Sequence, residues 1–336
     1  MKKLKIGVIG CGRISVMHFE SILQLYNLEL VACCDVKEER ANACAKKYSI
    51  KAYTDYVQML ENEELDAVHI CLPHYLHTKV ACDCFRKGIN VICEKPMDID
   101  YQSAKNAVDL AKEKGVLYGI VSQCRYNNSA KLVKQAVESG KLGKVLTARS
   151  ILTWSRSDDY YLESDWKGTW DKEGGGVVID QAIHSIDLVH WIVNSTPIKV
   201  QCSMANRGHE KVFVEDTAEG LITYENGTKY AFYCMNNYAS DEPIEIRLCC
   251  EKGNVVFGYD DAYIYYNDGR VEQAHQDDNT VEYEGGKDYW GFQQVKQISQ
   301  FYNAVLGIEP LEISGEEALK THKLIMDIYD KGGMHK

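Results

Sequence analysis

The chain has 336 residues, of which 49 are acidic and 38 basic, giving a formal net charge of −11. This charge would repel nucleic-acid phosphates and anionic membrane surfaces, and no basic cluster interrupts it, so we expect neither as a partner. A chain of this length exceeds the usual size of one domain, so we expect two domains and a cleft.

Cellular location is indicated by the apolar runs and the cysteines. Arg13 interrupts the first apolar run before it could serve as a signal peptide. No stretch approaches the roughly 18 to 20 apolar residues of a membrane-spanning helix. The 13 cysteines are scattered and form no repeated Cys-x-x-Cys pair. We therefore expect a cytoplasmic protein with buried, reduced thiols rather than a disulfide framework.

The first third of the chain alternates short apolar β-branched runs with amphipathic segments, which is typical of strand-helix-strand units around a parallel sheet. Apolar residues at spacings of three and four mark the helices. The expected strands are residues 4–9, 28–34, 66–72, 89–93 and 117–121, and the expected helices are 14–25, 37–47, 75–87 and 101–114.

The pattern changes near residue 122, so we expect one domain over 1–122 and another over 123–336. Strand-like runs without intervening helices indicate a mixed or antiparallel sheet in the second domain. Asn226-Gly227 and Asn267-Asp268-Gly269 have the composition of hairpin turns. The expected strands are 145–153, 199–204, 218–224, 228–235, 244–250 and 262–266, and the expected helices are 177–193, 289–306 and 315–329.

A glycine turn follows the first expected strand, in the sequence Gly10-Cys11-Gly12-Arg13-Ile14-Ser15. Two glycines of the dinucleotide fingerprint are present, and Ser15 stands where the third would be. Such a turn lets the backbone approach a pyrophosphate, while the next helix offers free amide groups and its positive dipole end. The alternative is a turn that serves geometry alone.

Asp35 ends the second strand, where a carboxylate can accept hydrogen bonds from the adenosine ribose. It would also repel a 2′-phosphate, so NAD is favoured over NADP. Asp35 could instead, or in addition, cap the helix that begins near Lys37.

Cys93-Glu94-Lys95-Pro96 follows the fifth strand, and here the sequence resembles the Gfo/Idh/MocA oxidoreductase family. Three further segments are similar to that family in the same order. They are 66–77, with Leu72-Pro73 and His77; 174–184, with a triple glycine followed by Asp180 and His184; and 314–318 at the start of the last helix.

The resemblance implies a Rossmann domain with a parallel sheet, followed by an α/β domain with an open, largely antiparallel sheet that often supports homo-oligomers. It implies NAD or NADP bound between the domains, and sugars, sugar derivatives or cyclitols as substrates. It identifies Lys95, Asp180 and His184 as catalytic residues. The implied cofactor-binding residues are Gly10, Gly12, Arg13, Ile14, Asp35, Leu72, Pro73, His77, Glu94 and Lys95.

Oxidation of a secondary alcohol requires a base and a group that stabilises the alkoxide, while the redox chemistry belongs to the cofactor. Asp180 and His184 are four residues apart on an expected helix, so they share one face. An imidazole titrates near neutral pH, which favours His184 as the base. Lys95 can stabilise the alkoxide, or take the proton itself if burial discharges it. The sequence leaves this division open.

Other residues have two interpretations each. His77 could line the nicotinamide pocket or cap its helix. Arg125 and Tyr126 could contact substrate or lie at a domain interface. Residues 160–170 form an aromatic and polar segment that suits a pyranose, with Trp166 and Lys167 as substrate contacts, or else an aromatic cluster that holds a loop. We expect no metal site, because Asp180 and His184 are too few ligands.

Three functions are compatible with these residues. The first is an NAD-dependent dehydrogenase of sugars or polyols that works as a dimer or tetramer. The second keeps NAD bound and oxidises a sugar transiently, often at ring carbon 3, to cleave or rearrange a glycoside. The third is a non-catalytic dinucleotide sensor, which the presence of Lys95, Asp180 and His184 together disfavours.

Overall fold

The computed structural model describes residues 3–275 and 293–334, and it divides into two compact units. The described parts of the first unit are residues 3–123 and 293–319, and those of the second are 124–275 and 320–334. Four residues of the expected helix 289–306, namely 289–292, lie outside the described residues.

The first unit contains a parallel six-stranded sheet in the order β3-β2-β1-β4-β5-β6. The chain moves outward from β1 to β3, then crosses β1 to begin β4, which is the topological switch point of a Rossmann fold. Its elements are β1 Leu4–Ile9, α1 Ser15–Leu23, β2 Leu28–Cys34, α2 Glu38–Tyr48, β3 Lys51–Tyr53, α3 Tyr56–Asn62, β4 Ala67–Ile70, α4 His77–Arg86, β5 Asn90–Cys93, α5 Tyr101–Lys114, β6 Tyr118–Ile120 and α9 Gln294–Val305.

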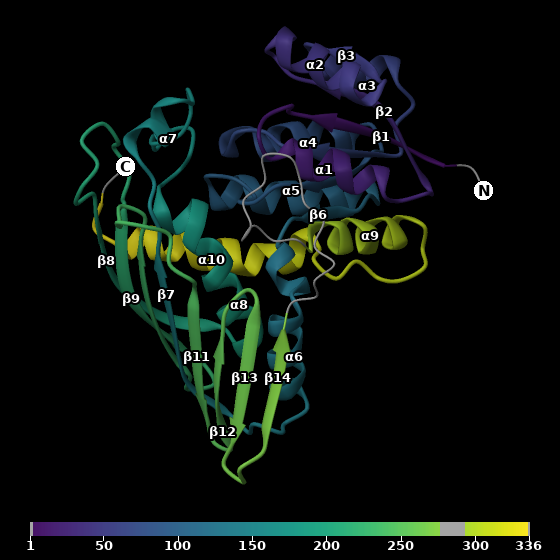
Figure 1. Cartoon of the computed structure of the whole chain (residues 1–336). Coiled ribbons are helices and arrows are strands. Elements are labelled where there is room, and N and C mark those ends of the chain that lie inside the picture. The colour runs from purple at the N-terminus through teal and green to yellow at the C-terminus, as the bar shows by residue number, and fades with distance from the viewer. Residues whose placement is uncertain (1–2, 276–292, 335–336) are drawn as a thin grey trace. The chain divides into compact units, whose positions relative to one another are not determined.

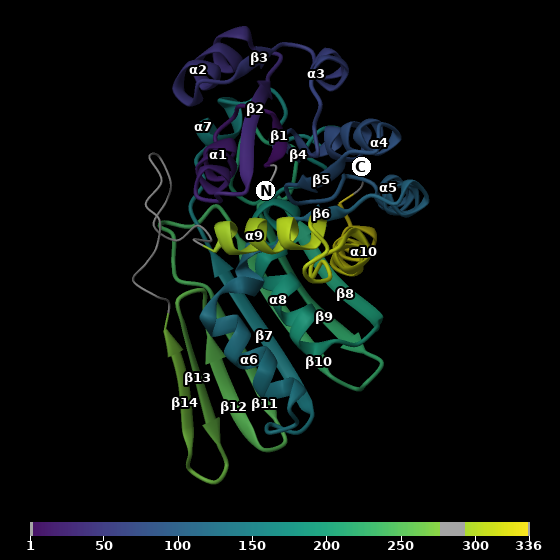
Figure 2. The same ribbon diagram turned by 90° about the vertical axis from the view of Figure 1, so that its right-hand side faces the viewer.

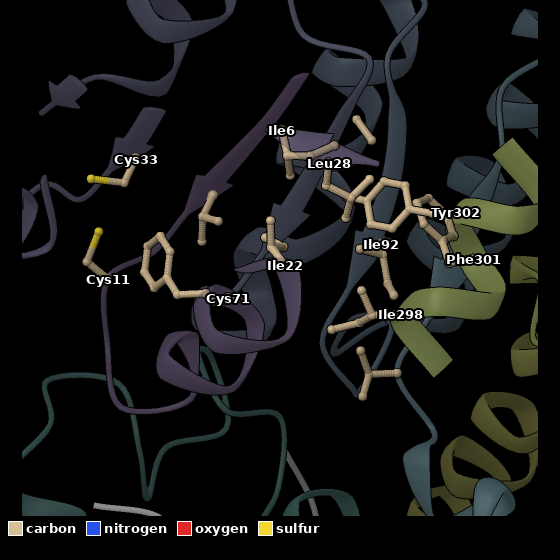
Figure 3. Close-up of a cluster of buried hydrophobic side chains, with 14 residues drawn as sticks. Ile6, Cys11, Ile22, Leu28, Cys33, Cys71, Ile92, Ile298, Phe301 and Tyr302 are labelled. Atoms are coloured by element: carbon tan, nitrogen blue, oxygen red, sulfur yellow. The ribbon is translucent and has the colours of Figure 1, made fainter. Parts of the chain in front are cut away.

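A buried apolar cluster joins this sheet to two helices from opposite ends of the chain. Ile6, Leu28 and Ile92 from the strands pack with Ile22 of α1 and with α9, which contributes three side chains (Figure 3). The helix α9 therefore belongs to the core of the first unit although about 170 residues separate it from β6. Those three side chains are Ile298, Phe301 and Tyr302.

The second unit contains an eight-stranded sheet in the order β14-β13-β12-β11-β7-β10-β9-β8. Every neighbouring pair is antiparallel except β7 and β10, so the sheet is largely antiparallel. The helices α6 (Asn128–Glu138) and α8 (Ile183–Val193) lie against one face of it (Figures 1 and 2). The strands are β7 Val145–Thr153, β8 Pro197–Ala205, β9 Thr217–Tyr224, β10 Lys229–Met235, β11 Glu245–Cys250, β12 Gly253–Phe257, β13 Asp261–Tyr266 and β14 Val271–His275.

Several elements were not expected from the sequence, and they include α3, α6 and the short edge strand β3. The helix α3 and the strand β3 are short, so tertiary packing rather than periodicity determines them. The helix α6 does have a helical pattern, because its buried residues Ala130, Val133 and Lys134 are spaced three and four apart. The last helix, α10 (Gly315–Lys331), contributes its first residues to the first unit and the remainder to the second.

The 13 cysteines form no disulfide, and nine of them are buried. The expectation of buried thiols is wrong for the other four, because Cys44, Cys82 and Cys202 are half-buried and Cys249 is exposed. None of the helices in the described part of the chain is long and apolar enough to cross a membrane.

Candidate active site

The glycine turn after β1 is fixed by contacts within the first unit. Gly10 has a φ of +97°, and a Cβ there would lie 2.2 Å from the carbonyl oxygen of Cys71, so only glycine fits. A Cβ on Gly12 would meet no atom within 4 Å. The Ser15 hydroxyl donates to the Gly12 carbonyl at 2.6 Å, and Ser15 is buried. Packing therefore requires Gly10, whereas no residue in the described part of the chain lies close enough to Gly12 to require a glycine there.

Asp35 connects this turn to the end of β2. One carboxylate oxygen accepts the backbone N–H of Cys11 at 2.9 Å, and the other accepts the N–H of Lys37 at 2.9 Å. The contact with the Lys37 N–H lies just before α2, the helix that the sequence suggested Asp35 could cap. A carboxylate oxygen has two lone pairs, so each of these oxygens can accept one further hydrogen bond.

The loops after β4 and β5 are held together by His77. Its side chain is fully buried, with Nδ1 2.6 Å from the Pro96 carbonyl oxygen and Nε2 2.7 Å from the Leu72 carbonyl oxygen. Pro96 and Leu72 each follow a strand at the carboxyl edge of the sheet. Gly10, Asp35, Leu72 and Glu94 therefore lie at one edge, because all six strands are parallel.

In the second unit, the triple glycine leads into the helix that carries Asp180 and His184. The helix was expected over 177–193, but its first turn, Val178–Ala182, is π-helical and the α-helix begins at Ile183. Buried Glu215 accepts the N–H groups of Gly176 and Val178 at 3.0 and 3.1 Å. Side chains thus bind the first N–H groups of this helix, in a wide turn of a kind often found at functional sites.

The glycines ahead of this helix allow those contacts. A Cβ on Gly175 would lie 2.0 Å from the Tyr329 hydroxyl, and one on Gly176 would lie 2.0 Å from the Glu215 carbonyl oxygen. The Tyr329 hydroxyl donates to Glu215 at 2.6 Å and accepts the N–H of Ile179 at 3.1 Å. Burial raises the pKa of Glu215 to about 7, although these hydrogen bonds act in the opposite direction.

Three side chains surround the Asp180 carboxylate. The Tyr160 hydroxyl donates to Oδ2 at 3.0 Å and the Gln181 amide donates to the same oxygen at 2.6 Å. The Lys167 ammonium lies 3.6 Å from Oδ2 and also hydrogen-bonds to the Tyr160 hydroxyl. Asp180 therefore has a counter-charge and two fixed donors, which orients it for contact with a hydroxyl of a ligand.

A second layer fixes Gln181 and the aromatic segment. Asn236 donates to Gln181 Oε1 at 2.9 Å and to the Tyr161 hydroxyl at 2.5 Å. The pKa of Tyr160 is raised, chiefly by burial and further by the nearby carboxyl groups of Asp180 and Glu173. The Tyr160 hydroxyl therefore stays protonated. Sequence reasoning missed Gln181 and Asn236, because an isolated amide in a helix or strand has no motif.

Trp166 and Lys167 lie close to each other, with the Lys167 ammonium 5.4 Å from the Trp166 ring centre and 3.7 Å from that of Tyr160. Both residues are half-buried, and so is His184. Arg125 and Tyr126, in contrast, are buried. Arg125 makes a bidentate ion pair with Asp187, at 2.8 and 2.6 Å, inside the second unit.

The fold and these two sets of residues define an oxidoreductase with an NAD-binding Rossmann domain. Residues 4–122 match the model of the oxidoreductase family with an NAD-binding Rossmann fold, and residues 130–256 match the Gfo/Idh/MocA C-terminal domain. The chain belongs to the Gfo/Idh/MocA family of oxidoreductases.

Similar proteins of this family cover nearly the whole chain. The myo-inositol 2-dehydrogenase of Thermotoga maritima is 25% identical, over 94% of this chain and 92% of its own length. The D-glucoside 3-dehydrogenase of Escherichia coli is 25% identical, over 97% and 94%. The WlbA dehydrogenase of Bordetella pertussis, solved with NADH and UDP-GlcNAcA, superimposes with a TM-score of 0.85 at 26% identity and covers 98% of this chain and 96% of its own.

Proposed function

We propose that this enzyme transfers hydride between NAD and a secondary alcohol of a sugar, a sugar derivative or a cyclitol. The observation that carries this proposal is the arrangement around Asp180, a carboxylate with fixed donors beside a half-buried lysine and tryptophan. A sugar hydroxyl group next to a reacting carbon needs such a polar contact, and its apolar ring face suits an aromatic side chain. The substrates named for the similar dehydrogenases are of this class.

The residues at the carboxyl edge of the first unit fit NAD. Gly12 leaves open space where a side chain would lie, as close approach of a pyrophosphate requires. Asp35 retains acceptor capacity for ribose hydroxyls, and its charge disfavours a 2′-phosphate. When bound, NAD supplies the hydride acceptor. The residues proposed to hold it are Gly10, Gly12, Arg13, Ile14, Asp35, Leu72, Pro73, His77, Glu94 and Lys95, with His77 acting through the two carbonyl groups that it fixes.

Lys95, Asp180 and His184 are proposed to be the catalytic residues. His184 removes the hydroxyl proton, since a neutral imidazole is a suitable base near neutral pH. The Lys95 ammonium stabilises the oxygen as negative charge develops on it. Asp180, oriented by Tyr160 and Gln181, binds a neighbouring hydroxyl.

Substrate selection is proposed to depend on Lys167, whose ammonium lies 3.6 Å from the Asp180 carboxylate, and on Trp166, whose ring lies beside that ammonium. For Arg125 we favour a structural role over substrate contact, because its guanidinium is committed to Asp187. Tyr126, the next residue in the chain, is also buried, and we assign it a structural role as well. Within the expected domain 123–336, the residues of the second unit are thus proposed to supply the substrate-binding and oligomerisation domain, whereas residues 293–319 belong to the first unit.

The test is NADH formation by purified protein mixed with NAD and a panel of hexoses, uronic acids, cyclitols and glycosides. We expect accumulation of NADH with one substrate class, and a loss of about 10²-fold or more in kcat for Lys95→Met and for His184→Ala. Both variants must retain the wild-type unfolding transition. Wild-type protein that binds NAD but converts none of these compounds would refute the proposal.

The same assay distinguishes the redox-neutral alternative. An enzyme that oxidises a sugar transiently to cleave or rearrange a glycoside regenerates NAD in each turnover, so product forms while NADH does not accumulate. Product analysis alongside absorbance therefore assigns one of the two mechanisms.

Assembly and location belong to this proposal as well. The sheet face opposite α6 and α8 carries exposed apolar side chains on β7, β9 and β13, namely Ile151, Leu221 and Tyr265. An apolar sheet face supports a homo-oligomer, a dimer or tetramer, that buries it. The 13 free thiols support a reducing, cytoplasmic location.

A further inference from the structure

A chain of buried polar side chains runs through the first unit and ends beside Lys95. The Tyr302 hydroxyl on α9 lies 2.6 Å from Nε2 of His69 on β4. Nδ1 of His69 lies 2.7 Å from Nδ1 of His18 on α1, and Nε2 of His18 lies 2.9 Å from the carboxylate of Glu94. The four residues are between 0% and 6% exposed. Each proton in the chain must therefore have a partner within it.

The Tyr302 hydroxyl decides the direction of these hydrogen bonds. Among the described residues its hydrogen-bond partner is His69 alone, so Tyr302 must donate its proton to His69 Nε2. A neutral His69 then carries its proton on Nδ1 and donates it to His18 Nδ1. His18 in turn carries its proton on Nε2 and donates it to Glu94. The series of hydrogen bonds therefore ends at Glu94, which accepts as an ionised carboxylate.

The opposite direction leaves a buried proton without an acceptor. If His18 were charged, if Glu94 carried a proton, or if the Gln294 amide, whose nitrogen lies 2.9 Å from His18 Nε2, donated to that nitrogen, His18 would donate to His69 and His69 would donate to Tyr302. The Tyr302 proton would then point into the apolar cluster that contains Ile92, Ile298 and Phe301 (Figure 3). An unmade hydrogen bond of a buried hydroxyl is costly, so the direction toward Glu94 is favoured.

The surroundings of Glu94 also favour its ionised form. The Gln294 amide donates to the same carboxylate oxygen as His18, at 3.0 Å, and the Lys95 N–H donates to the other at 3.2 Å. Burial would raise the pKa of Glu94, and the hydrogen bond from His18 acts in the opposite direction. The titratable groups that interact with Glu94 are His18 on α1, Cys71 after β4, Cys93 on β5, His77 on α4 and Lys95.

We propose that Tyr302, His69 and His18 are positioning residues that hold Glu94 as a carboxylate, and that this carboxylate positions Lys95. Glu94 accepts the backbone N–H of Lys95, which fixes the start of the loop that carries the lysine. Lys95 then stabilises the alkoxide, and His184 takes the proton. This last step rests on the proposed function, whereas the proton positions in the chain do not.

The proton positions can be measured directly by ¹⁵N NMR of the full chain labelled on its ten histidines. His18→Gln and His69→Gln assign the two ring systems by loss of signals. We expect His69 to carry its proton on Nδ1 and His18 to carry its proton on Nε2. A charged His18, or His69 protonated on Nε2, would overturn the proposal.

A tyrosine substitution tests the link to catalysis. Tyr302→Phe removes the hydroxyl that sets the direction, so Glu94 takes up a proton more easily as the pH falls. The acid limb of kcat/KM should move up by about half a pH unit, since a hydrogen bond to a charged group corresponds to about one unit and Tyr302 acts through two rings. The control is Tyr118→Phe, because Tyr118 is also buried in this unit and its hydroxyl has no partner among the described residues.

The outcomes separate this inference from the proposed function. If the tautomers are as expected but wild-type protein oxidises no sugar or cyclitol, the proposed function fails and the hydrogen-bond chain stands. If the enzyme is active but Tyr302→Phe and Tyr118→Phe have the same pH profile as wild type, the positioning role is refuted.

Discussion

The backbone N–H of Gly176 lies 3.0 Å from both carboxylate oxygens of Glu215, and a Cβ on Gly176 would lie 2.0 Å from the Glu215 carbonyl oxygen. The two residues therefore fix the start of the helix that carries Asp180. We expect Gly176→Ala to lower the free energy of unfolding by about 1–3 kcal/mol, because the backbone must move apart. Urea unfolding measures this. Gly12→Ala, which meets no atom within 4 Å, is the control, and an equal loss in both variants would contradict the packing argument.

Glu215 should also make stability depend on pH. Its pKa is raised by burial to about 7 in the folded protein from a usual value of 4.5, so the folded state binds the proton more tightly than the unfolded state. The resulting stabilisation is complete below about pH 4.5 and is lost as the pH rises through about 7, a difference of up to about 3 kcal/mol. Glu215→Gln, which keeps one oxygen for the two N–H groups and Tyr329, should remove this contribution. Thermal unfolding from pH 5 to 8 provides the comparison, and identical slopes for both proteins would exclude it.

The two glycines of the cofactor turn should respond differently to alanine. Gly10→Ala places a Cβ against the Cys71 carbonyl in a backbone conformation with positive φ, so we expect impaired folding. Gly12→Ala should fold normally and bind NAD at least about tenfold more weakly, because its Cβ occupies space proposed for the pyrophosphate. Calorimetric titration with NAD, together with a thermal unfolding curve, separates the two effects. Undiminished NAD affinity in Gly12→Ala would argue against the proposed binding mode.

Lys167→Met removes the counter-charge of Asp180. We expect a decrease of about tenfold or more in kcat/KM, since both the carboxylate and the Tyr160 hydroxyl lose a fixed neighbour. Lys172→Met is a matched control in the same loop, because Lys172 donates only to the Asp165 carbonyl oxygen among the described residues. Steady-state kinetics with the preferred substrate measures both, and equal kinetics in the two variants would remove Lys167 from the site.

Arg125→Met distinguishes a structural role from substrate contact. Removal of one partner from a buried ion pair leaves the Asp187 carboxylate uncompensated, so we expect about 3–5 kcal/mol of destabilisation. Burial alone would raise the pKa of Asp187, but Arg125 and Thr321 lower it. Arg149→Met is the control, because Arg149 pairs with Glu245 at the surface and should contribute at most about 1 kcal/mol. A stable Arg125→Met protein with a raised KM would instead show that Arg125 contacts substrate.

Much of the fold and part of the cofactor turn could be predicted from local sequence patterns. The alternation of apolar runs with amphipathic segments predicted the parallel sheet of the first unit, and the long polar-apolar runs after residue 144 predicted the largely antiparallel sheet of the second. Gly10 and Asp35 were recognisable because a tight turn and a carboxylate after a strand each have a fixed position relative to β1 and β2. These features depend on neighbours close in the chain, which a sequence pattern records.

Only the tertiary structure decided what surrounds those residues. Tyr302 and His69 are 233 positions apart and their hydrogen bond exists because α9 packs into the core of the first unit. Likewise, the reason for Gly176 is Glu215 on another segment, and Asn236 fixes Gln181 across 55 residues. Burial and long-range packing set these contacts, and neither leaves a local signal, so the triple glycine was visible in the sequence while its physical cause was not.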